Sequence, residues 1–283
     1  MNKKNHFIKR LSRGFIAFLS SVFLVCFFSL LILRVTLFSE DYMMKQAKQA
    51  DYYEELTTEI NQQIVVASMG SNIPDGILNH TIEQSFVEKD VNAYFKAIYH
   101  SSDNYSISSE KKIQERVVSE ITTYMKQKGQ EPSDSQEAID GLAKQAITIY
   151  TGYVKLPFLL SYGQKIINYK KYLLVFMIVC IVLWVALSAF LYSSLKGYLH
   201  RLLRYWGYIC MGSGLMLLIF PSFILVSGAL KKMGIQSRAM YDFIQQYVTG
   251  FVWLFIYTGA FSFIVGICFA VLSEVRRKQL FRS

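Results

Sequence analysis

The sequence predicts an all-α integral membrane protein with four transmembrane helices and an all-helical extracytoplasmic domain inserted between helices 1 and 2. Three observations support this prediction. Four uncharged apolar runs each reach the length of about 20 residues that a helix needs to cross a bilayer. A mostly polar stretch, residues 39–171, separates the first run from the second. Basic residues gather in alternate connecting segments, as in multi-pass membrane proteins.

The predicted segments follow one another from the N-terminus. They are a basic N-terminus (1–13), transmembrane helix 1 (14–38), the helical domain (39–171), transmembrane helix 2 (172–195), a basic loop (196–205), transmembrane helix 3 (206–227), a short outer loop with an amphipathic helix (228–249), transmembrane helix 4 (250–273) and a basic tail (274–283).

The distribution of charge predicts the orientation. Residues 1–13 carry five basic side chains, the 196–205 loop carries three, and the tail carries four against one acidic residue. Residues 39–171 hold 18 acidic and 14 basic residues. By the positive-inside rule both termini and the 196–205 loop are cytoplasmic, and residues 39–171 lie outside the cell membrane. The net charge of +10 is thus a topology signal and excludes a nucleic-acid-binding role. Lys231, Lys232 and Arg238, in the predicted outer loop, run against the pattern.

Apolar residues recur at steps of three and four through most of the domain, which predicts four or five helices. Residues 40–69 form one such stripe. Pro74 is expected to start a second helix, since its missing N–H costs little at a first helical position. Asp90 is expected to cap a third. Residues 109–128 and 133–153 complete the set.

Three residues of the short outer loop, Met240, Phe243 and Tyr247, lie on one helical face and form a candidate partner-contact surface. The helix that carries them either rests in the membrane interface or covers the underside of the exterior domain. A row of acidic residues, Asp51, Glu55 and Glu59, could bind a cation or a basic partner, but such a row is usually a solvated face.

Small residues in the fourth apolar run, Ser262, Gly266 and Ala270, form a ridge that allows close helix approach. The ridge serves either internal packing or a homo-oligomer. Pro221 in the third run predicts a kink.

The sequence predicts no enzyme, no cofactor and no metal site. It has no Gly-rich phosphate loop, no GxSxG and no HExxH motif. Two exterior histidines, His80 and His100, are too few for a zinc site. The four cysteines fall one in each apolar run, so no disulfide framework supports the exterior domain. A Cys-free exterior rich in Lys, Ile, Asn and Gln is typical of a bacterium with a single membrane.

The layout of one span, a large exterior domain and three clustered spans resembles that of the FtsX/MacB-type permease subunits, which pair with a separate ATPase. The resemblance is one of topology, and the exterior domains of those families are mixed α/β. In composition the chain is similar to four-span membrane proteins of low-GC Gram-positive bacteria.

Two functions are consistent with these features. The first is a non-enzymatic membrane-anchored scaffold, sensor or accessory protein, whose exterior helical domain binds a protein partner at the cell envelope. The alternative is a permease-like subunit coupled to a separate cytoplasmic ATPase, with its basic loop as a docking point.

Overall fold

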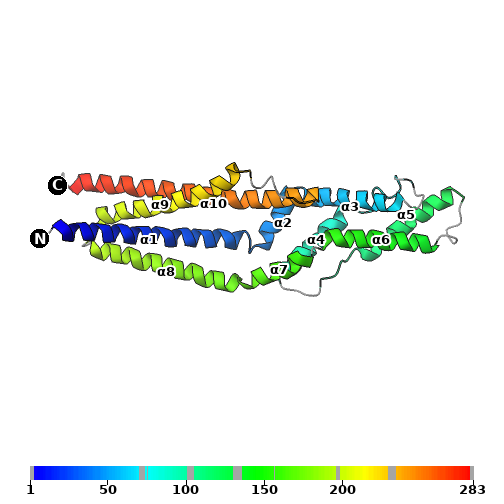
Figure 1. Cartoon of the computed structure of the whole chain (residues 1–283), viewed down its shortest axis with the longest axis horizontal. Helices are drawn as coiled ribbons and strands as arrows, with labels where there is room; N and C mark the ends of the chain where they lie inside the picture. The colour runs from blue at the N-terminus through cyan, green and yellow to red at the C-terminus, as the bar shows by residue number, and fades with distance from the viewer. Residues whose placement is uncertain are drawn as a thin grey trace. The chain divides into compact units, whose positions relative to one another are not determined.

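The computed structural model describes residues 3–69, 74, 76–100, 105–129, 136–155, 157–195, 198–228 and 234–280. These residues form helices, turns and short connections, without a β-strand (Figure 1). The helices are α1 (Lys3–Val35), α2 (Glu40–Gln49), α3 (Tyr52–Ser68), α4 (Gln84–Tyr99), α5 (Glu110–Gln127), α6 (Gln136–Val154), α7 (Pro157–Asn168), α8 (Lys170–Ser194), α9 (Leu199–Val226) and α10 (Arg238–Leu280). The predicted all-α class is confirmed.

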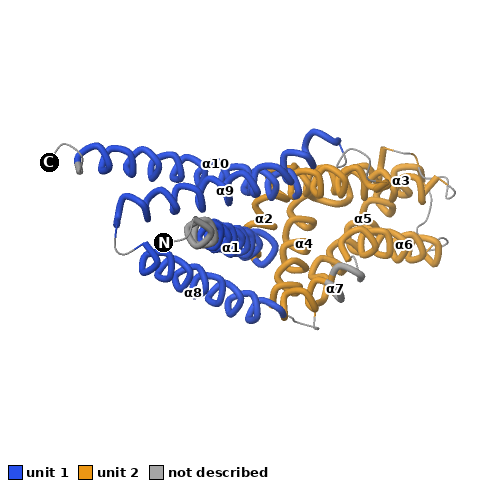
Figure 2. Tube along the Cα trace, turned by 60° about the vertical axis from the view of Figure 1, so that its left-hand side comes forward, with its two compact units in different colours: residues 1–38, 169–232, 248–283 blue, residues 39–168, 233–247 orange. Residues whose placement is uncertain are grey.

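The chain divides into two compact units, coloured separately in Figure 2. The first, here called the span bundle, comprises Met1–Phe38, Tyr169–Lys232 and Val248–Ser283. The second, here called the helical domain, comprises Ser39–Asn168 and Met233–Tyr247. A segment that follows α9 in the sequence therefore folds as part of the helical domain, most of which precedes α8.

Four helices are long and apolar enough to cross a membrane: Leu11–Val35, Lys170–Ser194, Leu199–Val226 and Arg238–Gln279. Large apolar side chains on them face outward. Phe176, Phe220 and Phe261, for example, are each more than 60% exposed. Soluble monomers rarely expose apolar surface on this scale. These helices are consistent with a multi-pass membrane protein.

Helices α9 and α10 both begin earlier in the chain than the spans that the sequence predicts. Helix α9 begins at Leu199, so most of the described part of the 196–205 loop is helical. Helix α10 runs without a break from Arg238 to Leu280, so the predicted amphipathic helix and the fourth span are one element. The only candidate breaker between them is Gly250, and a single glycine inside a helix costs only about 1 kcal/mol.

Glycines bring α9 and α10 together within the span bundle. A Cβ added at Gly214 would lie 2.7 Å from the carbonyl oxygen of Gly259, and one at Gly266 would lie 2.6 Å from the backbone nitrogen of Met211. Between these two contacts the hydroxyls of Ser213 and Ser262 are 2.9 Å apart. The seam excludes side chains larger than these, so the two backbones touch.

The predicted packing residues of the fourth span lie on this seam. Gly266 and Ala270 face Gly207 of α9, and Ser262 donates a hydrogen bond to the carbonyl oxygen of Cys210. The structure thus uses the small-residue ridge for internal packing. Pro221 is buried inside α9, and the helix continues beyond it to Val226.

A break at Asp51 divides the predicted 40–69 helix into α2 and α3. Asp51 has φ 49°, in the left-handed region, which aspartate enters more readily than most residues. Ser39 caps α2 by accepting a hydrogen bond from the Tyr42 amide. The chain thereby turns between two helices where the apolar pattern alone predicts one.

The amphipathic stripes form the core of the helical domain. They meet in a single buried cluster to which α3, α4, α5, α6 and the start of α10 all contribute. Its least exposed large side chains include Leu56, Ile60, Ile113, Ile121 and Tyr150. These come mostly from the stripes predicted from the sequence, so their period of about 3.6 residues identified the buried faces.

Candidate functional site

A carboxylate of α3 fixes the first turn of α10 in the helical domain. Glu59 accepts hydrogen bonds from the Ser237 hydroxyl at 2.8 Å and from the Ala239 amide at 2.9 Å. The Ser237 hydroxyl in turn accepts from the Met240 amide at 3.1 Å. Together they satisfy two of the amide groups that a helix leaves free at its start, where negative charge is also favourable. Glu59 is therefore a helix cap rather than part of a solvated acidic face.

The three predicted partner-contact residues lie on the first turns of this same helix. Phe243 is only 4% exposed, and its ring packs against those of Tyr52 and Phe95 at centroid distances of 5.0 and 5.9 Å. Tyr247 meets Tyr42 edge to face at 5.3 Å. Phe243 is thus covered by the helical domain of its own chain and offers no surface to a second protein. Of the two alternatives drawn from the sequence, packing against the helical domain matches this placement.

Met240, the third of these residues, lines a groove of about 1010 Å³. We call it the α3–α6–α10 groove after the helices that form it. Its apolar lining residues are Tyr52, Leu56, Ile149, Tyr153, Ile235, Met240 and Ile244, and its polar lining residues are Glu59, Gln62, Gln63, Thr148, Gln236, Ser237 and Arg238, with Gly152 between. An apolar surface with a few amide, hydroxyl and charged groups is the usual composition of a binding site.

A group of charged residues lies beside the groove. The Arg238 guanidinium is 3.7 Å from the Asp242 carboxylate, one turn along α10. Glu55 of α3 faces the same turn: one of its carboxylate oxygens, Oε2, is buried and receives no donor. Desolvation by burial, followed by the charge of Asp242, raises the pKa of Glu55 above its ordinary value of 4.5.

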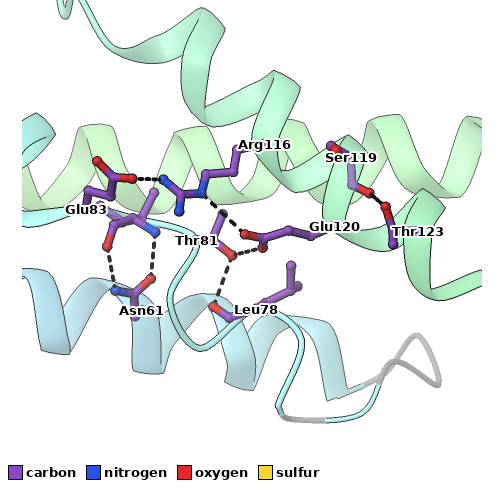
Figure 3. Close-up of polar contacts among 9 residues, drawn as sticks. Asn61, Leu78, Thr81, Glu83, Arg116, Ser119, Glu120 and Thr123 are labelled. Atoms are coloured by element: carbon purple, nitrogen blue, oxygen red, sulfur yellow. Dashed lines mark hydrogen bonds and ion pairs between the residues drawn. The ribbon is translucent and has the colours of Figure 1, made fainter.

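A second, more polar hollow of about 620 Å³ lies at the other side of α3. Figure 3 shows the contacts that shape its wall. Asn61 of α3 exchanges two hydrogen bonds with the backbone of Ile82, at 2.9 and 3.0 Å. Thr81 donates to Glu120 at 2.6 Å, and Arg116 bridges Glu120 and Glu83. In this hollow Arg116 is already paired with Glu83 and Glu120, and the lining offers less apolar surface than the groove does. The groove is therefore the stronger candidate.

The same contacts explain why Pro74 does not begin a helix. Residues 76–82 form turns, and α4 begins at Gln84. The Asn61 side chain supplies hydrogen bonds that a helix would otherwise supply to the Ile82 backbone. Since this partner lies 21 positions earlier, local periodicity could not reveal it.

Asp90 is the most deeply buried acidic residue that the structure describes, at 0% exposed. The expectation that it caps a helix is wrong, because it lies inside α4 with its side chain in the core. One carboxylate oxygen accepts from the amide and the hydroxyl of Ser108, at 3.1 and 2.8 Å, and the other accepts from the Tyr150 hydroxyl at 2.9 Å. Burial, and then the Asp90 charge, raises the pKa of Tyr150. Asp90 thus ties α4 to α6 and to the segment before α5.

The remaining candidates do not converge on a site. His80 borders the polar hollow, while His100 lies 3.1 Å from Glu40 on the surface. Among the described residues no three His, Cys, Asp or Glu side chains come together as a metal site would require. Ser133, the first residue of the predicted 133–153 helix, lies outside the described residues.

No protein-family model, no curated protein and no solved structure matches the chain.

Proposed function

We propose that this chain is a non-enzymatic, membrane-anchored sensor or scaffold whose helical domain binds a protein partner outside the cell membrane. In this proposal both termini and the 196–205 loop are cytoplasmic and residues 39–171 are extracytoplasmic. The alternation of basic and acidic segments supports that orientation. The membrane-spanning part anchors the domain and carries its state across the bilayer.

The observation that carries the proposal is the construction of the α3–α6–α10 groove. Two of its walls are formed by α3 and α6, and the third is formed by the first part of α10 and the residues just before it. That helix continues into the fourth apolar span without a break. A partner bound in the groove would therefore contact a helix that itself enters the membrane.

The chemistry of the groove favours a protein segment as the occupant. Half-buried Ile149, Met240 and Ile244 offer an apolar strip, and exposed Gln62 and Gln63 offer amides that can pair with a peptide backbone. Arg238, an exposed cation that lines the groove, would pair with an acidic side chain of the partner. This arrangement matches an amphipathic segment that lays its apolar face into a groove.

Photo-crosslinking in living cells tests this proposal. With a photoreactive amino acid at Gln63, we expect a discrete adduct with one partner. The charge placed on the groove surface by Ile149→Glu should abolish this adduct, since burying a charge costs several kcal/mol.

The matched control uses Thr123, an exposed residue of α5 that does not line the groove. A probe at Thr123 should give no such adduct, and Thr123→Glu should leave the adduct at Gln63 unchanged. If the probes at Gln63 and Thr123 capture the same proteins equally well, the groove is not the binding site. A cytoplasmic ATPase held in stoichiometric amounts would instead support the permease-subunit alternative.

A further inference from the structure

Two carboxyl groups, of Glu55 on α3 and of Asp242 on α10, lie close together at the first turns of α10. The buried oxygen of Glu55 has no hydrogen-bond donor, and the group next to it is the Asp242 carboxyl. Both groups are acceptors when ionised, so they repel each other. When one of them is protonated, it donates to the other and the contact becomes a hydrogen bond.

The neighbouring charges leave this pair only partly compensated. Arg238 is 3.7 Å from Asp242, but its side chain is 83% exposed, so water screens its attraction. Glu59 adds negative charge on the same face of α3, although its own oxygens are held by Ser237 and Ala239.

The other helices packed on α3 bring few charges toward Glu55. Tyr153 of α6 lies near the charge of Glu59. Glu88 of α4 lies near Tyr53, on another side of α3. On α2, Glu40 acts on Tyr99. The charged groups close enough to Glu55 to change its pKa are Asp242, Arg238 and Glu59.

We propose that Glu55 and Asp242 form a proton-operated latch that fastens residues 234–247 to α3 in acid and loosens them as the pH rises. The latch lies beside the α3–α6–α10 groove and moves one of its walls. It deepens the proposed function by naming proton concentration as a stimulus, and to that extent rests on it.

The direction of the effect follows from the linkage between protonation and attachment. The pKa of Glu55 is raised when the segment is attached and returns to its ordinary value when the segment leaves and water enters. The attached state therefore binds the proton more tightly. Its advantage is complete below the ordinary pKa of Glu55, 4.5, and is lost as the pH rises through the raised value. One proton changes the ratio of attached to detached protein by at most about tenfold per pH unit in that window.

Distance measurement between two spin labels tests the latch. The full-length protein, with its four native cysteines replaced, carries labels at Gln63 on α3 and Gln236 just before α10, both exposed. It is placed in lipid nanodiscs at about pH 4, below the ordinary pKa of glutamate, and at about pH 8, well above it. We expect one short, narrow distance distribution in acid, and a longer, broader component whose share increases at the higher pH.

Three amide variants decide between the latch and other causes. Glu55→Gln and Asp242→Asn each supply a permanent donor of nearly the same shape, so either variant should keep the short distance at both pH values. Glu54→Gln, at the exposed neighbouring position on α3, should respond to pH as the parent does. A pH-independent distance in the parent, or a full pH response in Glu55→Gln, overturns the latch. The partner adduct at Gln63 is measured separately, so the latch can fail while partner binding persists, and the reverse.

Discussion

Replacing Asp90 with alanine is expected to destabilise the helical domain by about 3 kcal/mol or more. The change leaves the buried Tyr150 hydroxyl without its acceptor. It also removes two hydrogen bonds from Ser108, which is exposed, and a hydrogen bond to a charged group contributes about 1.5–3 kcal/mol. Each buried polar group that loses its partner costs about 1–3 kcal/mol. Chemical unfolding of the full-length protein in micelles, followed by pulse proteolysis of residues 39–168, measures the loss.

The matched variant is Asp90→Asn, which keeps the size and one acceptor oxygen of the side chain. Its oxygen can still accept from Ser108, and its amide can donate to Tyr150, so the loss of stability should be clearly smaller than for alanine. Equal stability of Asp90→Ala and the parent would mean that this buried network does not hold α4, α6 and the segment before α5 together.

Introducing leucine at Gly214 or Gly266 should separate α9 from α10. A Cβ at either position meets backbone atoms at 2.6–2.7 Å, and backbone cannot rotate away as a side chain can. Overpacking typically costs about 1–3 kcal/mol, and a clash with backbone should lie at or above the upper end. In a background without native cysteines, Ser213→Cys with Ser262→Cys reports the contact, because the two hydroxyls are 2.9 Å apart. Disulfide formation, read as protection from a maleimide reagent, should be nearly complete in the parent and largely lost with either leucine.

Gly14→Leu is the control for this experiment. Gly14 lies in the first apolar helix, and a Cβ there meets nothing within 4 Å. The same substitution in the same kind of helix should therefore leave the 213–262 disulfide intact. Equal disulfide yields in all three leucine variants would show that the seam does not depend on the close approach of the two backbones.

The parts of the fold that could be predicted from the sequence are those encoded over short stretches. A run of uncharged apolar residues identifies a spanning-length helix wherever it occurs, because bilayer thickness sets its length. A 3.6-residue apolar period identifies the buried face of an amphipathic helix, as it did for Ile113, Val117 and Ile121. The small-residue ridge at Ser262 and Gly266 was also visible, since close packing requires small side chains.

The parts that could not be predicted depend on contacts between distant segments. Glu59 looks like one member of a solvated acidic row until Ser237 and Ala239 are placed beside it, about 180 positions later. Asp90 looks like a helix cap until Tyr150 and Ser108 surround it. Phe243 joins a core whose other residues lie mostly in Ser39–Asn168, a segment that ends 75 positions before it. The groove likewise forms only when the start of α10 packs beside α3 and α6. Of its lining residues, the sequence therefore indicated only Met240 as a candidate partner contact.

Cysteine labelling determines on which side of the membrane the helical domain lies, and so tests the orientation on which the proposed function depends. In a Cys-free background, single cysteines at Ser106 in the helical domain and at Gln279 near the end of α10, both exposed, are treated with a membrane-impermeant maleimide in intact cells. We expect the cysteine at position 106 to react at once and the one at position 279 to react only after the cells are permeabilised. Labelling of position 279 in intact cells, with position 106 protected, would contradict this orientation and place the groove in the cytoplasm.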